Sequence, residues 1–213
     1  MPLKLPVYFD NNATTPVDPR VLDEMLPYFS EKFGNASSRT HSYGWEAEEA
    51  VDIAREQVAN LIGAHPQEIV FTSGATEAVN LAIKGICEKY PGEKKHIITV
   101  STEHKAVLDT CKRIEEPGGK VTYLPVNAEG LINLADLENA ITEDTVLISV
   151  MYANNETGVI QPVRDIAALA KKYNVTFMSD ATQAVGKMAV NVQSDGIDLL
   201  TLSAHKLYGP KGV

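Results

Sequence analysis

The feature that most constrains this fold is a recurring unit: a short apolar run, then small or polar residues, then a helical pattern. The runs are apolar throughout rather than alternating with polar residues, and they are EIVF (68–71), HIITV (96–100), TVLISVMY (145–152), VTFMS (175–179) and IDLLTLS (197–203). Strands of this kind, separated by helices, are typical of a parallel sheet whose two faces are both covered. The sequence therefore predicts an α/β fold with three layers, α/β/α, around a mostly parallel sheet.

The first 60 residues do not follow this pattern. Residues 45–64 have the periodicity of one long amphipathic helix that ends at Gly63. The polar segment 33–44 before it is longer than a simple connector needs to be, so we predict a functional role for it.

The composition excludes several classes of protein. The 213 residues are 44% hydrophobic and 22% charged, as in ordinary globular proteins. A net charge of −9, without a Lys/Arg cluster, argues against nucleic-acid binding, and no apolar run is long enough for a membrane span or a signal peptide. Cys87 and Cys111 form no C-x-x-C motif, so a reducing, cytoplasmic setting fits best.

Polar or ionisable residues follow each apolar run. Because parallel strands end at the same edge of a sheet, where ligands of open α/β sheets bind, these residues are candidates for one site. They are Ser73-Gly74-Ala75-Thr76, Glu103-His104, Asn154-Asn155, Asp180 with Gln183, and Ser203 with His205 and Lys206.

The segment TSGATE (72–77) is a glycine turn that opens a predicted helix. The free N–H groups and the dipole of such a helix start can hold a phosphate. The alternative is an ordinary helix start with Thr72 or Ser73 as its N-cap. Neither the Walker nor the dinucleotide-binding spacing of glycines is present.

Asp180 and Lys206 each follow an apolar strand. A carboxylate there needs a cation or several hydrogen bonds, and a lysine desolvated there is a nucleophile toward carbonyls. The alternatives are an aspartate that caps the next turn and a solvated lysine on a loop. A phosphate loop, a buried anion and a Schiff-base lysine together are what pyridoxal phosphate requires, so the sequence predicts a site for that cofactor.

Two interpretations of His104 are open. A histidine after a strand is often a loop residue, but a neutral ring there can stack on an aromatic cofactor and transfer protons near neutral pH. A zinc site built from His41, His65, His96, His104 and His205 has no supporting i,i+4 or C-x-x-C spacing, so no metal is expected.

Motifs along essentially the whole chain resemble one family. They are NNATTPVDPRV, FGNASSRTHSYGWEAEEAVDIAR, FTSGATEAVNLAIKG, HIITVSTEHKAVLDTC, NNETGVIQP, SDATQAVGK and SAHKLYGPKGV, in order and with few gaps. The set resembles the cysteine desulfurases of the NifS/IscS type. These are pyridoxal phosphate enzymes of the class-V aminotransferase group with the aspartate aminotransferase fold (fold type I). The resemblance implies conversion of L-cysteine to L-alanine, with the sulfur passed to an enzyme cysteine as a persulfide.

The resemblance also implies roles for individual residues. Lys206 would bind the cofactor as a Schiff base, Asp180 would pair with its pyridinium nitrogen, and His104 would stack on the ring and move protons. Gln183 and Asn155 would bind the phenolate oxygen, with Asn155 also near the substrate carboxylate. The phosphate would be held by Ala75, Thr76, Ser203 and His205.

The resemblance divides the chain into an N-terminal arm on the substrate side (1–15) and a cofactor-binding large domain (16–213) that is incomplete at its C-terminal end. We expect an N-terminal fragment that ends just after the lysine. The family's persulfide cysteine, its substrate-binding arginine, one antiparallel strand and the small domain all lie downstream. Neither Cys87 nor Cys111 matches the persulfide loop, so the fragment alone is expected to be inactive.

Further expectations from the resemblance are a homodimer and sulfur transfer to an iron–sulfur scaffold or another acceptor protein. Two alternatives stay open. One is another class-V enzyme, such as a selenocysteine lyase, a kynureninase or an aminotransferase. The other is a non-catalytic remnant that binds pyridoxal phosphate or a partner.

Overall fold

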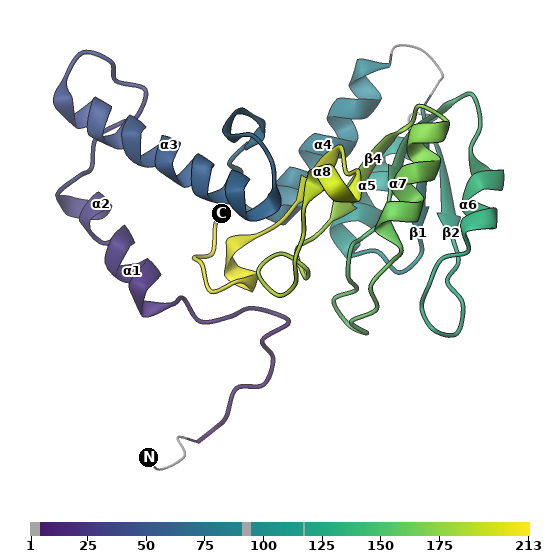
Figure 1. Ribbon diagram of the computed structural model, residues 1–213, viewed down its shortest axis with the longest axis horizontal. Coiled ribbons are helices and arrows are strands. Elements are labelled where there is room, and N and C mark those ends of the chain that lie inside the picture. Colours follow the sequence, from purple (N-terminus) through teal and green to yellow (C-terminus); the bar gives the residue numbers. More distant parts are fainter. Residues whose placement is uncertain (1–4, 91–94, 117) are drawn as a thin grey trace.

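A computed structural model describes residues 5–90, 95–116 and 118–213, so residues 1–4 of the predicted N-terminal arm lie outside the described residues (Figure 1). The helices are α1 (Pro19–Met25), α2 (Pro27–Ser30), α3 (Ser42–Ile62), α4 (Ala75–Lys89), α5 (Lys105–Glu115), α6 (Leu134–Ala140), α7 (Val163–Lys172) and α8 (Val192–Asp195). The strands are β1 (His96–Val100), β2 (Lys120–Leu124), β3 (Thr145–Ser149), β4 (Thr176–Asp180) and β5 (Leu199–Thr201). Short 3-10 turns cover Pro66–Glu68 and Ala204–Lys206.

The strands form a 5-stranded sheet in the order β2-β1-β3-β4-β5, and each neighbouring pair is parallel. The predicted parallel sheet is therefore confirmed. From β1 the chain moves to β2 on one side of β1, and then to β3 on its other side. Such a reversal of strand order opens a crevice at the carboxyl ends of the strands, which is where α/β proteins bind their ligands.

The two faces of the sheet carry separate cores. Ile97 and Leu147 pack with α4 and α5, whereas Ile98 and Ile148 pack with α6 and α7. Successive strand residues point to opposite faces, so β1 and β3, each buried along its whole length, carry apolar side chains toward both faces. The polar residues of these two strands are buried as well: His96, Thr99, Thr145 and Ser149. Coverage of both faces confirms the predicted three layers.

One predicted strand is wrong. EIVF (68–71) begins in a 3-10 turn and continues as extended chain, with 67% of Val70 exposed. A strand needs a neighbour to receive its main-chain hydrogen bonds, and a cleft of about 1280 Å³ lies between this segment and β5. β2, which the sequence did not reveal, lies at the opposite edge of the sheet and is only partly buried.

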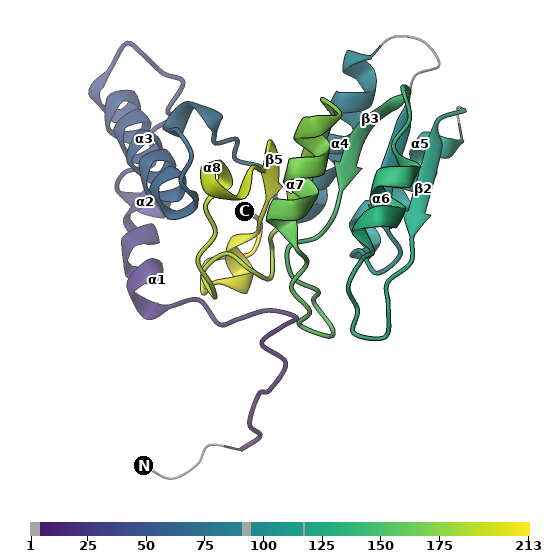
Figure 2. The ribbon, with the colours of Figure 1, turned by 45° about the vertical axis from the view of Figure 1, so that its right-hand side comes forward.

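Helices α1, α2 and α3 stand to one side of the α/β body (Figures 1 and 2). The predicted long helix is confirmed as α3, and Gly63 ends it with a left-handed φ of 70°. The left-handed conformation favours glycine here, and a Cβ at Gly63 would lie 2.2 Å from the side-chain amide of Asn191, which would have to move. None of the helices in the described ranges combines the length and apolar character of a membrane span.

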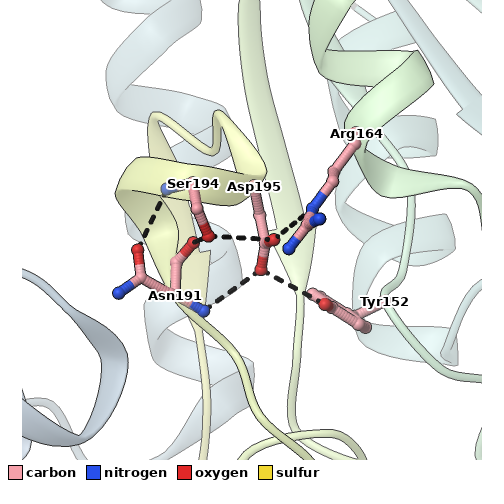
Figure 3. Close-up of polar contacts among 5 residues, drawn as sticks. All are labelled: Tyr152, Arg164, Asn191, Ser194 and Asp195. Atoms are coloured by element: carbon pink, nitrogen blue, oxygen red, sulfur yellow. Dashed lines mark hydrogen bonds and ion pairs between the residues drawn. The ribbon is translucent and has the colours of Figure 1, made fainter.

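Asp195, the last residue of α8, is a buried carboxylate that joins three elements (Figure 3). It accepts hydrogen bonds from Arg164 Nε on α7 at 2.9 Å, from the Tyr152 hydroxyl after β3 at 3.2 Å, and from Asn191 N–H at 3.1 Å. Burial opposes its charged form, but these hydrogen bonds outweigh burial, so the pKa of Asp195 lies below its ordinary value. The network holds α8, and with it the chain entering β5, against the rest of the body.

Candidate active site

A cavity of about 460 Å³ lies at the carboxyl ends of β1, β3, β4 and β5. The segments that follow these strands form its walls, together with the start of α4 and part of the N-terminal segment. Every residue to which the resemblance assigns a role lines this one cavity: Ala75, Thr76, His104, Asn155, Asp180, Gln183, Ser203, His205 and Lys206. Of the other candidates, Glu103 and Asn154 do not line it. The structure thus brings together side chains that are up to 131 residues apart, from Ala75 to Lys206 (206 − 75 = 131).

Lys206 is half-buried at the end of the 3-10 turn that follows β5. Its Nζ donates a hydrogen bond to the main-chain carbonyl of Asn12, at 2.5 Å. Partial burial is the main reason that the pKa of Lys206 lies below its ordinary value, and the charge of Lys187 adds to this effect. A lower pKa leaves more of the amine neutral, which is the form that attacks a carbonyl.

Asp180 ends β4 and is only 6% exposed. Its Oδ1 accepts a hydrogen bond from Thr182 N–H at 3.0 Å, which is the capping role that the sequence left open. Within the described ranges no lysine, arginine or histidine forms an ion pair with this carboxylate. The buried Thr182 hydroxyl beside it also has no hydrogen-bond partner in the part of the chain that the structure describes. This part of the cavity therefore has an anion and a hydroxyl available for a cationic ligand group.

The start of α4 faces the same cavity through Ala75 and Thr76. The first N–H groups of a helix have no partner inside the helix, and they carry the positive end of its dipole. Gly74 opens this turn with a φ of 130°, a conformation that favours glycine, and the turn lies beside Ser203. His205 also lines the wall, while the Ser203 hydroxyl donates to Val213 O at 3.1 Å. The N–H groups at the start of α4 are therefore the donors that an anion would meet first.

His104 is the N-cap of α5 rather than a free loop residue. Its Nδ1 accepts a hydrogen bond from Ala106 N–H at 3.2 Å, so the neutral ring carries its proton on Nε2. The exposed ring lines the cavity, where Nε2–H is available to a ligand.

Asn154 and Asn155 were both candidates by their position after a strand, although the resemblance gave a role to Asn155 alone, and they lie differently in the structure. Asn154 fixes its own loop, because its Nδ2 donates to Thr102 O at 2.9 Å and its Oδ1 accepts from Thr157 N–H at 2.8 Å. Only Asn155 of the two lines the cavity. Gln183 also faces it, and its Nε2 donates to Asn12 O at 2.9 Å.

Glu103 is a buried carboxyl at this site whose role the sequence analysis missed. It is 6% exposed, its Oε1 accepts a hydrogen bond from Met151 N–H at 2.5 Å, and its buried Oε2 has no hydrogen-bond partner among the described residues. Burial, and then the negative charge of Asp180, raise the pKa of Glu103 well above its ordinary value. Glu103 thus joins the segments that follow β1 and β3, and it holds a proton over a wider pH range than an ordinary glutamate.

The described side chains indicate neither a metal site nor a reactive thiol. In the described part of the chain, no three histidine, cysteine or acidic side chains gather as a metal site would require. Cys87 and Cys111 are buried, and burial is the main cause that raises the pKa of both thiols, to about 12 for Cys111. Thiols of this kind are poor nucleophiles.

Comparison with known proteins decides the family. The sequence model described as "Aminotransferase class-V" matches residues 7–213. This chain belongs to the aminotransferase class-V family. The cysteine desulfurase IscS of Rickettsia rickettsii (strain Iowa) is 56% identical to it over 211 residues, which are 99% of this chain and 52% of the relative. The predicted resemblance to cysteine desulfurases is thereby confirmed.

Solved structures of other proteins also superpose closely on this chain. A "NIFS-LIKE PROTEIN" superposes with a TM-score of 0.94 and 47% sequence identity, covering 97% of this chain and 57% of that one. The structure of "SspA in complex with cysteine" also gives a TM-score of 0.94 and 47% identity, over 96% of this chain and 59% of that one. The chain spans about half the length of the curated relatives that it matches.

Proposed function

We propose that this chain carries the pyridoxal phosphate-binding part of a cysteine desulfurase, with residues 1–15 as an arm on the substrate side and residues 16–213 as the large domain. The observation that carries the proposal is one cavity lined by the amine of Lys206, the carboxylate of Asp180 and the N-terminus of α4. L-Cysteine is the proposed substrate, because relatives are named cysteine desulfurases and one similar structure is a complex with cysteine.

The donor set fits the three reactive parts of pyridoxal phosphate. Lys206 would bind its aldehyde carbon, and Asp180, which has no cationic partner among the described residues, would hold the proton on the pyridine nitrogen. Ala75 and Thr76 would hold the phosphate, together with Ser203 and His205. When bound, pyridoxal phosphate supplies an electron sink for the bonds at the α-carbon of an amino acid.

The remaining side chains of the cavity would orient the ligand and move protons. His104 would lie against the ring, with Nε2 as the atom that exchanges a proton, because Nδ1 is engaged by Ala106 N–H. Gln183 and Asn155 would bind the phenolate oxygen of the cofactor, and Asn155 would also approach the substrate carboxylate. Amide side chains suit this task because they donate hydrogen bonds without adding charge.

A thiol other than those of Cys87 and Cys111 would accept the sulfur of the substrate, since both of these thiols are buried and their pKa values are raised. We propose that the complete enzyme supplies a persulfide cysteine downstream of Lys206, acts as a cytoplasmic homodimer and passes sulfur to an iron–sulfur scaffold or another acceptor protein. The 213-residue chain alone is then inactive in desulfuration.

A spectroscopic experiment separates this function from its alternatives. The chain is loaded with pyridoxal phosphate, and the absorbance of the bound cofactor is recorded while L-cysteine, L-selenocysteine, L-kynurenine or L-alanine is added. We expect the spectrum to respond to L-cysteine at the lowest concentration. A preference for L-kynurenine would indicate another class-V activity, and a loaded chain that responds to no amino acid would be a non-catalytic remnant.

A further inference from the structure

The N-terminal segment NNATT (11–15) lies against the turn that carries Lys206. Residues 14–18 contact this turn through main-chain and side-chain hydrogen bonds that bridge about 190 residues of sequence. Thr15, which is 7% exposed, is the best buried residue of these contacts and does not itself line the cavity. Any influence of Thr15 on the cavity must therefore pass through the main chain.

Thr15 holds the turn on both sides of the lysine. Its N–H and its Oγ1 both donate to the carbonyl of His205, at 2.9 Å and 3.0 Å, which fixes the peptide group immediately before Lys206. The same Oγ1 accepts the N–H of Tyr208 at 2.8 Å, two residues after the lysine. One hydroxyl thus acts as donor and acceptor and closes a ring around the residue whose amine enters the cavity.

The turn needs such a restraint because Tyr208 has a left-handed backbone, with a φ of 64°. A bulky residue such as tyrosine rarely adopts this conformation, and it does so only when its surroundings enforce it. The N–H of Tyr208 is held by Thr15 and its carbonyl by Asp18 N–H at 2.9 Å, so both of its main-chain polar groups are bound to the N-terminal segment.

We propose that Thr15 is a positioning residue for Lys206. The inference rests on the proposed function of Lys206 and adds a device that sets where its amine points. With the peptide groups before and after it fixed, the lysine keeps the partly buried position in which its Nζ reaches Asn12 O at the cavity wall. Loss of the Thr15 hydroxyl would leave Tyr208 N–H without its acceptor, loosen the turn and let the amine move toward solvent.

The test compares Thr15→Val, which removes the hydroxyl and keeps the branched shape, with Thr15→Ser, which keeps the hydroxyl. The matched control is Thr145→Val. Thr145 is also buried, and its Oγ1 accepts Thr142 N–H and contacts His96 Nδ1, both at 2.8 Å, at the opposite end of the sheet. If Thr15→Val does not fold, Thr15→Cys replaces it, because a thiol retains a weak donor and acceptor.

Two properties are measured in each variant. The first is the pH dependence of Lys206 acetylation in the chain without cofactor, followed by mass spectrometry. The second is the rate at which added pyridoxal phosphate becomes fixed by borohydride. We expect Thr15→Val to move the Lys206 titration toward the ordinary lysine range and to slow fixation roughly tenfold, as the loss of one or two hydrogen bonds would do. Thr15→Ser should restore both properties, and Thr145→Val should change neither after correction for lost stability.

Equal effects of Thr15→Val and Thr145→Val, or a Thr15→Ser variant that behaves like Thr15→Val, would overturn the proposal. The acetylation measurement needs no cofactor. A chain in which Lys206 never binds pyridoxal phosphate would therefore refute the proposed function, while the role of Thr15 in setting the lysine titration would still be decided.

Discussion

Gln183 Nε2 donates a hydrogen bond to the main-chain carbonyl of Asn12 at 2.9 Å, although the two residues are 171 positions apart. Lys206 Nζ donates to the same carbonyl. The N-terminal segment is thus bound to two of the side chains proposed to hold the cofactor, which supports the proposal that this segment is an arm beside the substrate. A bound cofactor would have to exchange these hydrogen bonds for its own.

Replacement of Asp180 by asparagine should weaken cofactor retention. The amide oxygen of the new side chain would still accept Thr182 N–H, but a neutral amide could not balance a protonated pyridine nitrogen. A hydrogen bond to a charged group contributes about 1.5–3 kcal/mol, so we expect the dissociation constant of pyridoxal phosphate to rise roughly 10- to 100-fold. Equilibrium dialysis measures this constant.

The control is Asp198→Asn, at the opposite end of the sheet, where Asp198 Oδ2 accepts Phe177 N–H at 2.8 Å. Equal retention by both variants would return Asp180 to a capping role.

Replacement of Glu103 by glutamine should destabilise the fold less than the removal of a charge from a buried site usually does. The pKa of Glu103 is raised in the fold, so the unfolded chain releases this proton first and the fold loses stability as pH rises above the unfolded pKa of about 4.3. Glutamine keeps an acceptor for Met151 N–H and carries no charge. Urea unfolding at pH 5 and pH 8 should show the variant gaining stability relative to the parent at the higher pH. A variant that loses stability at pH 8 would show that the charged carboxylate is needed.

His96 should make the fold sensitive to mild acid. The ring is buried at the start of β1, where its nitrogens contact Thr145 Oγ1 and Thr122 Oγ1, each at 2.8 Å. Burial, with a further contribution from the charge of Lys120, lowers the pKa of His96, while Asp144 opposes this shift. Because the folded pKa lies below the unfolded one, the stabilisation is present above about pH 6.5 and is lost as pH falls through the folded value.

Thermal unfolding between pH 7.5 and pH 5 measures this effect. Part of the fall in melting temperature should disappear in His96→Gln, and it should persist in the control His65→Gln, because His65 is exposed. An unchanged pH profile in His96→Gln would contradict the prediction.

Asp195 and Arg164 should contribute unequally to stability, although they form one ion pair at 2.9 Å. The Arg164 side chain is 72% exposed, so we expect Arg164→Met to cost about 0–1 kcal/mol. Asp195→Ala leaves Asn191 N–H and the Tyr152 hydroxyl without their acceptor, and it should cost about 2–6 kcal/mol, from about 1–3 kcal/mol for each unpaired buried group. Urea unfolding of both variants measures the difference. Similar losses would show that the ion pair, and not the buried acceptor, stabilises α8.

The sequence was sufficient for the parts of the fold that a single segment determines. β1 and β3 are buried along their whole length, so their apolar runs identify them. β2 could not be found in this way because an edge strand is only partly buried. The segment EIVF was wrongly predicted to be a strand because its composition suits one. Strand formation also depends on a neighbouring strand, which the local sequence does not specify.

The candidate site, too, could be predicted from the sequence only in part. Residues that follow apolar strands could be collected from the sequence, because parallel strands end at one edge. Glu103 and Thr15 gain their importance from contacts across 48 residues with Met151 and across 193 residues with Tyr208. Such contacts exist only in the folded chain, so residue type and spacing alone did not reveal them.

The central claim is that Lys206 binds pyridoxal phosphate covalently, and borohydride reduction followed by peptide mapping tests it most directly. The chain is loaded with pyridoxal phosphate, reduced and digested, alongside the variants Lys206→Ala and Lys211→Ala. Lys211 lines the same cavity and serves as the matched control. We expect the reduced adduct on the peptide that contains Lys206 in the parent chain and in Lys211→Ala, and no adduct at this site in Lys206→Ala. An adduct on another lysine of the parent chain, or one that persists unchanged in Lys206→Ala, would contradict the account.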